Sequence, residues 1–403
     1  MFEHTGECKT HSMALSTVVV AAAFWSLAIV ILGASHVTRT RTHRTADVVK
    51  AVLSPRNTEH TAEIRSRVHP HEHFALTPSS AILDPSRHDS FVQDATALIA
   101  SVSPQQCAGW QRFVKCAEKC TEMFLPSREV DFAAFIQSVT FCIIITGFYG
   151  VDPGTLSPID VAFVTNTLNR HSDSTSRQTP LYPSELDAMR ERVCRWVGGE
   201  RAPQALETIL PAYESMWRLT AVTLAYADGN QHMHNAFLDF SENPTQKQFR
   251  SFKVKNTRPS VEAIISEVLR LHPPIQRIAR KSRHPLWKRL FYPAQEIADI
   301  GAVHRSCVYG TRLETFDAMR FHPQHEHPVD MQLLAFGHGG LSCVAREWAP
   351  MATALIVAKV VDRVDDVGFV LAGKVFDARM YRNTRIGWDG WVVRKKEREK
   401  LVS

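Results

Sequence analysis

The chain has 403 residues, enough for one large domain or for two or three of average size. Apolar residues make up 44% of it and charged residues 22%, which excludes a disordered, collagen-like or coiled-coil chain. The formal net charge of +6 is spread along the chain, so we expect no nucleic-acid partner. Eight cysteines without a CxxC pair are too few for a disulfide framework, which favours a thiol-reducing compartment for most of the chain.

An apolar stretch near the N-terminus bears on the membrane question. Residues 13–32 carry no charge, and a helix of that length spans about 30 Å, the thickness of the hydrocarbon core of a bilayer. Three arginines follow the stretch and a single lysine precedes it, so the positive-inside rule places the body of the chain in the cytosol. The alternative, a cleaved signal peptide, is disfavoured because the preceding residues are not basic. We therefore expect a lumenal tail over 1–12 and a transmembrane anchor over 13–33.

The residues after the anchor are predicted to be mainly helical with small sheets. The range 34–90 is polar and rich in His, Pro and Ser, so we expect a linker and irregular structure there. A helical pattern runs over 91–145, and 151–185 is expected to be rich in loops. The short apolar run at 141–150 is too short to cross a membrane and is expected in the core.

Two long amphipathic helices and two short strands are expected in the second half of the chain. Apolar residues at i, i+3, i+4 and i+7 predict a helix over 202–226. A second helix should begin after Ser260, a good N-cap, and end before Pro273. Strands are predicted over 296–303 and 387–394.

One cysteine lies in a glycine-rich segment. Residues 336–345 read FGHGGLSCVA, and a helical pattern follows them. Glycines adopt positive φ angles and let a backbone approach a ligand closely. Amide groups and the dipole of the following helix would favour a thiolate at Cys343. Such a thiolate is suited to be an axial ligand of haem iron, the alternative being a small residue buried in a loop.

Three more motifs precede this segment and together suggest a family. Glu267 and Arg270 are three residues apart on one helix face and can pair. The sequences AVHR at 302–305 and FDAMRF at 316–321 follow. In this order and at these intervals, the four motifs resemble those of a cytochrome P450 of the membrane-bound fungal type. The resemblance covers residues 200–395 and agrees with an N-terminal anchor.

The resemblance implies a cytochrome P450 fold, with residues 91–403 forming the catalytic domain that binds haem b. Cys343 would be the thiolate ligand of the iron, with Phe336, Gly339 and Arg280 also contributing to cofactor binding. The helix at 202–226 would cross the distal side of the haem. Glu267, Arg270 and Arg320 would form a buried charge triad with a structural role. Glu214 and Ser215 would be the acid and the alcohol that relay protons.

The chain departs from the family pattern at several positions. Leu341 stands where the family usually has an Arg or His that pairs with a haem propionate, and His338 or Arg277 could take over that role. Ala345 replaces a usual glycine and Ala318 a common proline. No Trp is followed four residues later by Arg, and the region before the distal helix is short for the family. The chain would then be a divergent or truncated member.

The resemblance also implies a function and its partners. A haem-thiolate monooxygenase would receive electrons from NADPH through a membrane-bound cytochrome P450 reductase, with cytochrome b5 as an additional partner. It would insert one oxygen atom into an apolar small molecule, in fungal secondary metabolism, at the endoplasmic reticulum membrane and in contact with its lipid. Two alternatives stay open: a haem-thiolate enzyme that catalyses rearrangement or dehydration, and a haem-deficient, non-catalytic relic.

Two further cysteines share a helix face. Cys116 and Cys120 are four residues apart, and no second ligand pair is visible beside them. Because a zinc site needs further ligands beside these two, core or free thiols are favoured over a metal site.

Overall fold

The computed structural model describes most of the chain beyond its first 39 residues. The proposed tail and anchor lie outside the described residues. The described ranges are 40–54, 85–126, 129–172, 182–199, 202–253, 258–281, 295–310, 312–324, 332–366, 369–372 and 387–395.

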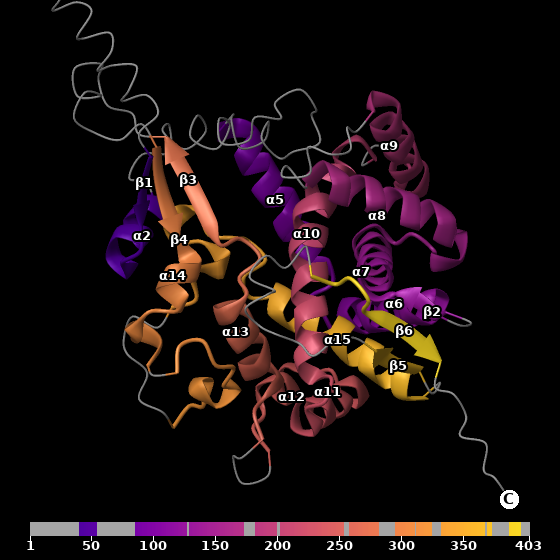
Figure 1. The fold of residues 1–403 in the computed structure, drawn as a ribbon. Coiled ribbons are helices and arrows are strands. Elements are labelled where there is room, and N and C mark those ends of the chain that lie inside the picture. Colours follow the sequence, from indigo (N-terminus) through magenta and orange to yellow (C-terminus); the bar gives the residue numbers. More distant parts are fainter. Residues whose placement is uncertain are drawn as a thin grey trace, which may run out of the picture.

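Helices form most of the described structure, as predicted (Figure 1). The α-helices are α2 (Ala46–Leu53), α5 (Pro85–Ser101), α6 (Cys107–Phe124), α7 (Phe132–Tyr149), α8 (Pro158–Ser172), α9 (Pro183–Val197), α10 (Ala202–Ala227), α11 (Gln231–Glu242), α12 (Gln246–Arg250), α13 (Val261–Leu271), α14 (Ile300–His304) and α15 (Ala349–Asp366). Short 3₁₀ helices are η1 (Pro153–Thr155), η4 (Cys307–Tyr309), η5 (Ala318–Phe321), η6 (Leu334–Phe336) and η7 (Gly339–Leu341).

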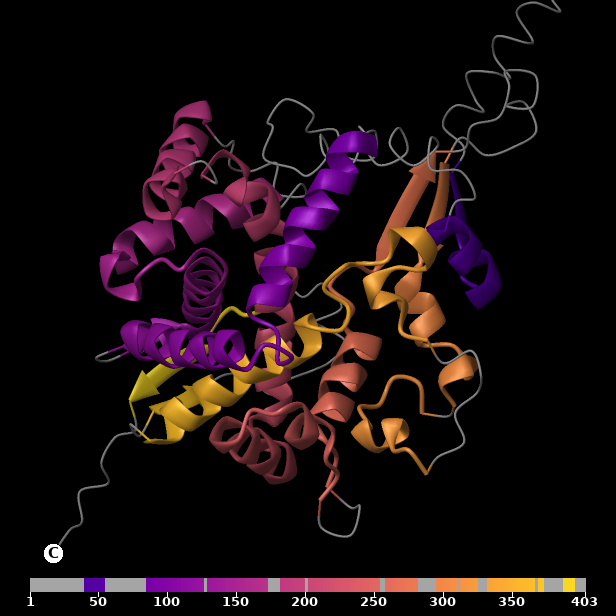
Figure 2. The ribbon, with the colours of Figure 1, turned by 180° about the vertical axis from the view of Figure 1, so that it is seen from behind.

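Two three-stranded sheets lie on opposite sides of the helices (Figures 1 and 2). In the first, β4 (Gln295–Asp299) pairs in parallel with β1 (Thr40–His43) and antiparallel with β3 (Arg277–Lys281). In the second, β6 (Val392–Lys395) pairs antiparallel with β2 (Glu129–Asp131) and with β5 (Phe369–Ala372). Each sheet joins segments that are far apart in the sequence.

The main core forms where α6, α7, α10 and α15 pack on one another. Helix α7 is apolar around its whole circumference, which is the pattern of a helix buried on all sides. Its length and composition alone would also allow it to cross a membrane, but 78% of its apolar window is buried inside the protein. The expectation that 141–150 belongs to the core is therefore confirmed. A second, smaller core joins α2, β4, α14 and η6.

Helices α10 and α13 confirm two predictions and position the site. Helix α13 begins at Val261, and the side chain of Ser260 accepts a hydrogen bond from the N–H of Ala263 at 3.1 Å. Helix α10 continues through Pro211, which has no N–H to donate to the carbonyl of Glu207. Both helices pack against each other and against α15, so the helix that follows Cys343 meets both.

Three predictions about secondary structure were wrong. Within 34–90, the described residues 40–54 and 85–90 form β1, α2 and the first turns of α5 where a linker was expected. Strand β1 is held by its pairing with β4, which local sequence does not reveal. The rest of this range lies outside the described residues. The range 151–185 contains α8 and the start of α9. The strand expected over 296–303 ends at Asp299, whose side chain caps α14 by accepting from the N–H of Ala302 at 3.0 Å.

Candidate active site

The glycine-rich segment forms a tight loop with the thiol at its surface. The N–H of Cys343 donates to the carbonyl of Phe336 at 2.7 Å, and the N–H of Ser342 donates to that of Gly339 at 3.0 Å. These bonds fold the segment back on itself between η6 and η7. Cys343 itself is exposed. This exposure rules out the alternative of a small residue buried in a loop, and it leaves the thiol open to a ligand.

Two glycines are required by the shape of this loop. Gly337 and Gly339 have φ angles of +77° and +67°, which residues with a side chain rarely adopt. A Cβ on Gly339 would lie 2.6 Å from the Cβ of Ser54, the C-cap residue of α2. Helix α2 therefore packs directly against the thiol loop. This contact brings a segment expected to be linker into the site.

The helix after the thiol begins later than the sequence suggested. Residues 344–348 form successive turns, and α15 begins only at Ala349. The N–H of Arg346 donates to the carbonyl of Cys343 at 3.2 Å, and that of Trp348 to the carbonyl of Ala345 at 3.0 Å. The expectation that Cys343 lies just before a helix therefore needs correction, because five residues in turns separate it from α15. The dipole of α15 acts on the thiol only through these intervening turns.

The predicted charge triad is assembled in the core. Arg270 donates to both carboxylate oxygens of Glu267, at 2.7 and 2.8 Å, and both side chains are completely buried. Arg320 approaches the same carboxylate at 3.6 Å. The backbone N–H of Asp317 donates to Glu267 at 2.9 Å. A buried carboxylate with several donors is satisfied, so the triad is stable as a unit.

The triad is connected to the thiol loop through His304. Arg270 donates to the backbone carbonyl of His304 at 3.0 Å. The Nε2 atom of His304 accepts from the N–H of Leu334 at 2.9 Å, and Leu334 begins η6, the turn that contains Phe336. Hydrogen bonds, joined by the His304 residue and by the short backbone segment from Leu334 to Phe336, therefore connect Glu267 to Cys343. His304 was part of the AVHR motif, but its position in this path was not predicted.

His304 must be neutral to accept this hydrogen bond. Complete burial lowers its pKa to about 3, and the neighbouring guanidinium of Arg270 also contributes to lowering it. The unfolded chain, with an ordinary histidine pKa of about 6.5, binds a proton that the folded chain excludes. The contribution of His304 to stability is therefore complete above pH 6.5 and is lost as the pH falls toward 3.

We expect this titration to be measurable. Between pH 7 and pH 5, His304 should lower the free energy of unfolding by about 2 kcal/mol. A His304→Gln variant keeps a hydrogen-bond acceptor but has no titrating ring, so its stability should depend less on pH by that amount. Urea unfolding followed by circular dichroism at both pH values measures the difference. Equal pH dependence in the two proteins would contradict the assignment.

Glu214 and Ser215 lie in the middle of α10, as predicted. The carboxylate of Glu214 is nearly buried and forms an ion pair with Arg218, one turn later, at 3.2 Å. Arg218 also donates to the carbonyl of Pro274 at 2.9 Å, so the pair is fixed against the end of α13. Ser215 is half-buried, and Pro211 on the same side of the helix is exposed. Arg218 was not predicted, although its i, i+4 spacing from Glu214 is a visible signal.

The two proposed substitutes for Leu341 have other partners. Arg277 is 64% exposed and forms an ion pair with Asp299 at 3.1 Å. In the amide orientation that satisfies its neighbours, Gln332 donates to Nδ1 of His338 at 3.2 Å and accepts from Arg346 at 3.0 Å. Arg280 is almost completely buried on β3, opposite Glu296 of β4. Arg280 is therefore a basic residue held inside the protein, whereas Arg277 on the same strand is exposed.

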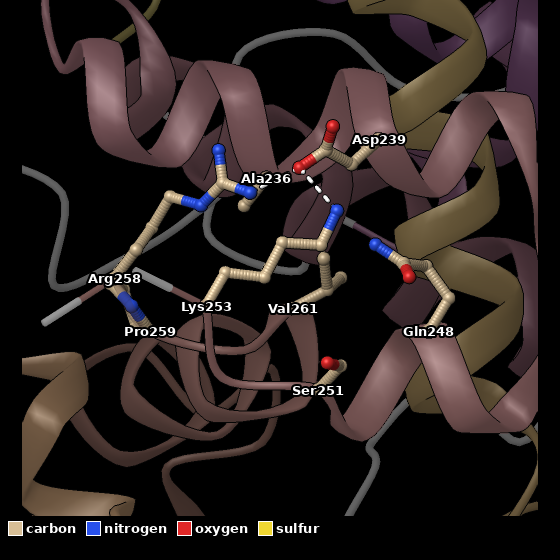
Figure 3. A pocket seen from close by; sticks show the side chains of 8 residues that line it. All are labelled: Ala236, Asp239, Gln248, Ser251, Lys253, Arg258, Pro259 and Val261. Atoms are coloured by element: carbon tan, nitrogen blue, oxygen red, sulfur yellow. Dashed lines mark hydrogen bonds and ion pairs between the residues drawn. The ribbon is translucent and has the colours of Figure 1, made fainter. Parts of the chain in front are cut away.

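A small hollow between α11, α12 and α13 is not a candidate site (Figure 3). It encloses about 10 Å³, room for no more than one water molecule. Lys253 and Arg258 point into it, and both form ion pairs with Asp239. The cations are thus neutralised locally. No thiol lines this hollow.

Solved structures with the same arrangement of elements are cytochromes P450. The chain matches the haem domain of cytochrome P450DA with a TM-score of 0.57 and 16% identity, over 82% of this chain and 81% of that one. It matches a protein from a study of unusual cytochrome P450-like monooxygenases involved in microbial secondary metabolism with a TM-score of 0.52 and 16% identity, over 82% and 86%. For CYP109B1 from Bacillus subtilis, the values are 0.51 and 14%, over 88% and 92%.

The chain has the cytochrome P450 fold. No family model and no curated protein sequence matches it. The predicted fold, mainly helical with small sheets, is confirmed. At 14–16% identity, the P450 fold is established by architecture.

The thiol loop and Arg280 on β3 have the chemistry needed by the haem that the P450 fold implies. An exposed thiol on a loop that only glycines can form is a suitable soft ligand for iron. The buried guanidinium of Arg280 can pair with a carboxylate such as a propionate. Leu341, which is half-buried in η7, offers no charge for a second propionate. The donor set therefore fits haem, with one propionate partner fewer than the P450 pattern provides.

Proposed function

We propose that this chain is a haem-thiolate monooxygenase. The observation that carries the proposal is the exposed thiol of Cys343, held on a glycine loop that is hydrogen-bonded through His304 to a buried charge triad. Such a network fixes the backbone that carries the thiol. A preorganised ligand is what a permanently bound metal cofactor requires.

Each residue of the site has a specific task in this proposal. The Cys343 thiolate would hold the iron, the backbone around Phe336 and Gly339 would shape the loop beneath it, and Arg280 would bind a propionate. When bound, haem with a thiolate ligand supplies the chemistry that cleaves the O–O bond of dioxygen. The triad of Glu267, Arg270 and Arg320 would not touch the cofactor. Both arginines pair with the Glu267 carboxylate, and both also donate to backbone carbonyls.

Helix α10 would supply protons in this reaction. The hydroxyl of Ser215 can donate and accept a hydrogen bond, and the carboxylate of Glu214 can take up and release a proton through water. Arg218 fixes the position of the Glu214 carboxylate on the helix. The pair therefore offers an acid and an alcohol on the helix that packs against α15, the helix after the thiol loop.

We expect loss of the relay to slow turnover without removing haem. The double change Glu214→Gln and Ser215→Ala should lower the turnover rate about 100-fold or more, since positioned acid–base groups contribute about that much. The absorption spectrum should be unchanged. A matched control is Glu191→Gln, which removes the carboxylate of an exposed i, i+4 pair with Arg195 on α9. Normal turnover in the double variant would favour the second candidate below.

A rearrangement or dehydration enzyme is the second candidate, and one observation favours it. The Glu214 carboxylate is engaged by Arg218, which restricts its freedom to shuttle protons. An enzyme of this class would keep the thiolate-bound haem but would not need the relay. Its product would contain no oxygen from dioxygen, which labelling with heavy oxygen gas measures directly.

The substrate, electron donors and location are part of the same proposal. We propose an apolar small molecule as the substrate, in a secondary-metabolite pathway. This is supported by the study of unusual cytochrome P450-like monooxygenases of microbial secondary metabolism to which one matching structure belongs. Electrons would come from NADPH through a membrane-bound reductase, with cytochrome b5 as a further donor. The apolar stretch at 13–32 supports attachment to the endoplasmic reticulum membrane, with the catalytic domain in the cytosol.

Removal of the apolar stretch tests the attachment. Deletion of residues 1–33 should move most of the protein from the membrane fraction to the supernatant and leave the haem spectrum unchanged, because a span of this length is what holds a chain in a bilayer. Fractionation after a carbonate wash measures the distribution. A truncated protein that stays in the washed membranes would show that another segment attaches it.

The absorption spectrum of the reduced, CO-bound protein tests the central claim. A strongly red-shifted Soret band is expected from thiolate-bound haem. A Soret band at the ordinary position would mean haem without the thiolate ligand. Absence of any Soret band would support the haem-deficient relic. Leu341 is consistent with that outcome, because it offers no charge to a haem propionate.

A further inference from the structure

Two cysteine thiols are in contact in the core, far from the proposed haem ligand in the sequence. Cys120 on α6 and Cys142 on α7 have their Sγ atoms 2.7 Å apart. Both residues are completely buried. Non-bonded heavy atoms pack at about 3.5–4.0 Å, so the two sulfurs are closer than ordinary packing brings them. The contact lies in the interface between two of the main core helices.

A third thiol and a hydroxyl complete the cluster. Cys116 lies one turn before Cys120 on α6 and is half-buried, and the hydroxyl of Thr146 on α7 is 3.6 Å from the sulfur of Cys120. The hydrogen bond with Cys120, and then burial, raise the pKa of Cys142, while burial raises that of Cys116. The raised pKa values keep the thiols of Cys142 and Cys116 neutral. A neutral thiol reacts slowly with metals and with oxidants, so the 2.7 Å contact marks the pair that can join, and the reaction requires local opening that lets a thiolate form.

We propose that Cys120 and Cys142 are an oxidisable pair that closes to a disulfide between α6 and α7, with Cys116 remaining a thiol. In this step each of the two thiols gives up one electron and one proton, and a sulfur–sulfur bond forms. Hydrogen peroxide is the oxidant: it takes up the two electrons and two protons, its O–O bond breaks, and two water molecules result. The proposal is independent of haem binding.

Burial determines how this pair would behave. Since both sulfurs are inaccessible in the closed structure, peroxide reaches them during folding or through local opening of the helix interface. Once formed, the bond would be shielded in the same way from thiol reductants. A disulfide here would close the chain between Cys120 and Cys142, which contains β2, into a loop. Loop closure lowers the conformational entropy of the unfolded chain and so raises the melting temperature.

Peptide mapping of the full-length protein tests the pairing directly. The protein is incubated with hydrogen peroxide, unfolded, alkylated without reductant and digested with trypsin. Trypsin cuts after Lys119, Arg128 and Arg170, so Cys116, Cys120 and Cys142 fall in three different peptides. We expect a joined product of peptides 120–128 and 129–170, and an alkylated Cys116. Alkylation of both Cys120 and Cys142, or a bond that includes Cys116, would overturn the proposal.

Thermal unfolding of two variants gives an independent test. Wild-type protein treated with peroxide should melt about 3–6 °C above protein kept in dithiothreitol. The matched variant Cys116→Ala should keep this difference, and Cys142→Ala should abolish it. A difference that persists in Cys142→Ala would overturn the proposal. If Cys142→Ala does not fold, the peptide map of the wild-type chain decides alone.

Discussion

Replacement of Cys343 by alanine should abolish the thiolate-type spectrum and all turnover. The thiol is exposed on a loop whose shape depends on two left-handed glycines, and its backbone N–H is bonded to Phe336. The Cys343→Ala change leaves these backbone bonds in place and removes only the sulfur atom. Folding should therefore be preserved while the ligand is lost. The reduced, CO-bound spectrum and circular dichroism measure the two properties separately.

Cys307 provides the matched control for this experiment. It is also exposed, and it lies in η4 rather than in the glycine loop. Cys307→Ala should keep both the red-shifted band and turnover. A thiolate-type spectrum that survives in Cys343→Ala would exclude Cys343 as the ligand, and its loss in Cys307→Ala would point to that residue instead.

Removal of the Glu267 carboxylate should have the largest effect on folding. Glu267→Ala leaves Arg270 completely buried without its bidentate partner, and Arg320 loses the same carboxylate. Breaking a buried ion pair at one side costs about 3–5 kcal/mol, which is a large share of the stability of an ordinary protein. We expect much of the variant to be insoluble, and its soluble part to unfold at clearly lower urea concentration and to retain little haem.

Another carboxylate on the same helix serves as control. Glu262 lies in the first turn of α13 and forms an exposed ion pair with Arg250 at 3.2 Å. Exposed pairs contribute about 0–1 kcal/mol, so Glu262→Ala should unfold close to the wild type. Equal stability of Glu267→Ala and Glu262→Ala would show that the triad is not a structural support.

Sequence alone could predict the parts of the site that are encoded locally. The N-cap at Ser260 and the pairing of Glu267 with Arg270 depend on spacing within one helix, and the structure confirms both. The place of Cys343 in a glycine loop is encoded in the same way. Arg320 was assigned from the family resemblance, and the structure places it beside Glu267.

Contacts between distant segments could not be predicted. The pairing of β1 with β4 joins residues about 250 positions apart. The sequence of neither strand indicates which other strand it pairs with. The connection of His304 to Leu334 likewise depends on how two turns meet in the core. The late start of α15 was missed because residues 344–348 have a helical pattern but form turns.

The position of β1 has a geometric consequence for a membrane-attached chain. Only residues 33–39 separate the apolar stretch from Thr40, where β1 begins. A segment of this length reaches at most about 25 Å when fully extended. If the apolar stretch lies in the bilayer, the edge of the β1–β4–β3 sheet must stay within that reach of its surface. The tether would then orient the protein, so that the side of the molecule with this sheet and α2 faces the lipid and the side with β5 and β6 faces the cytosol.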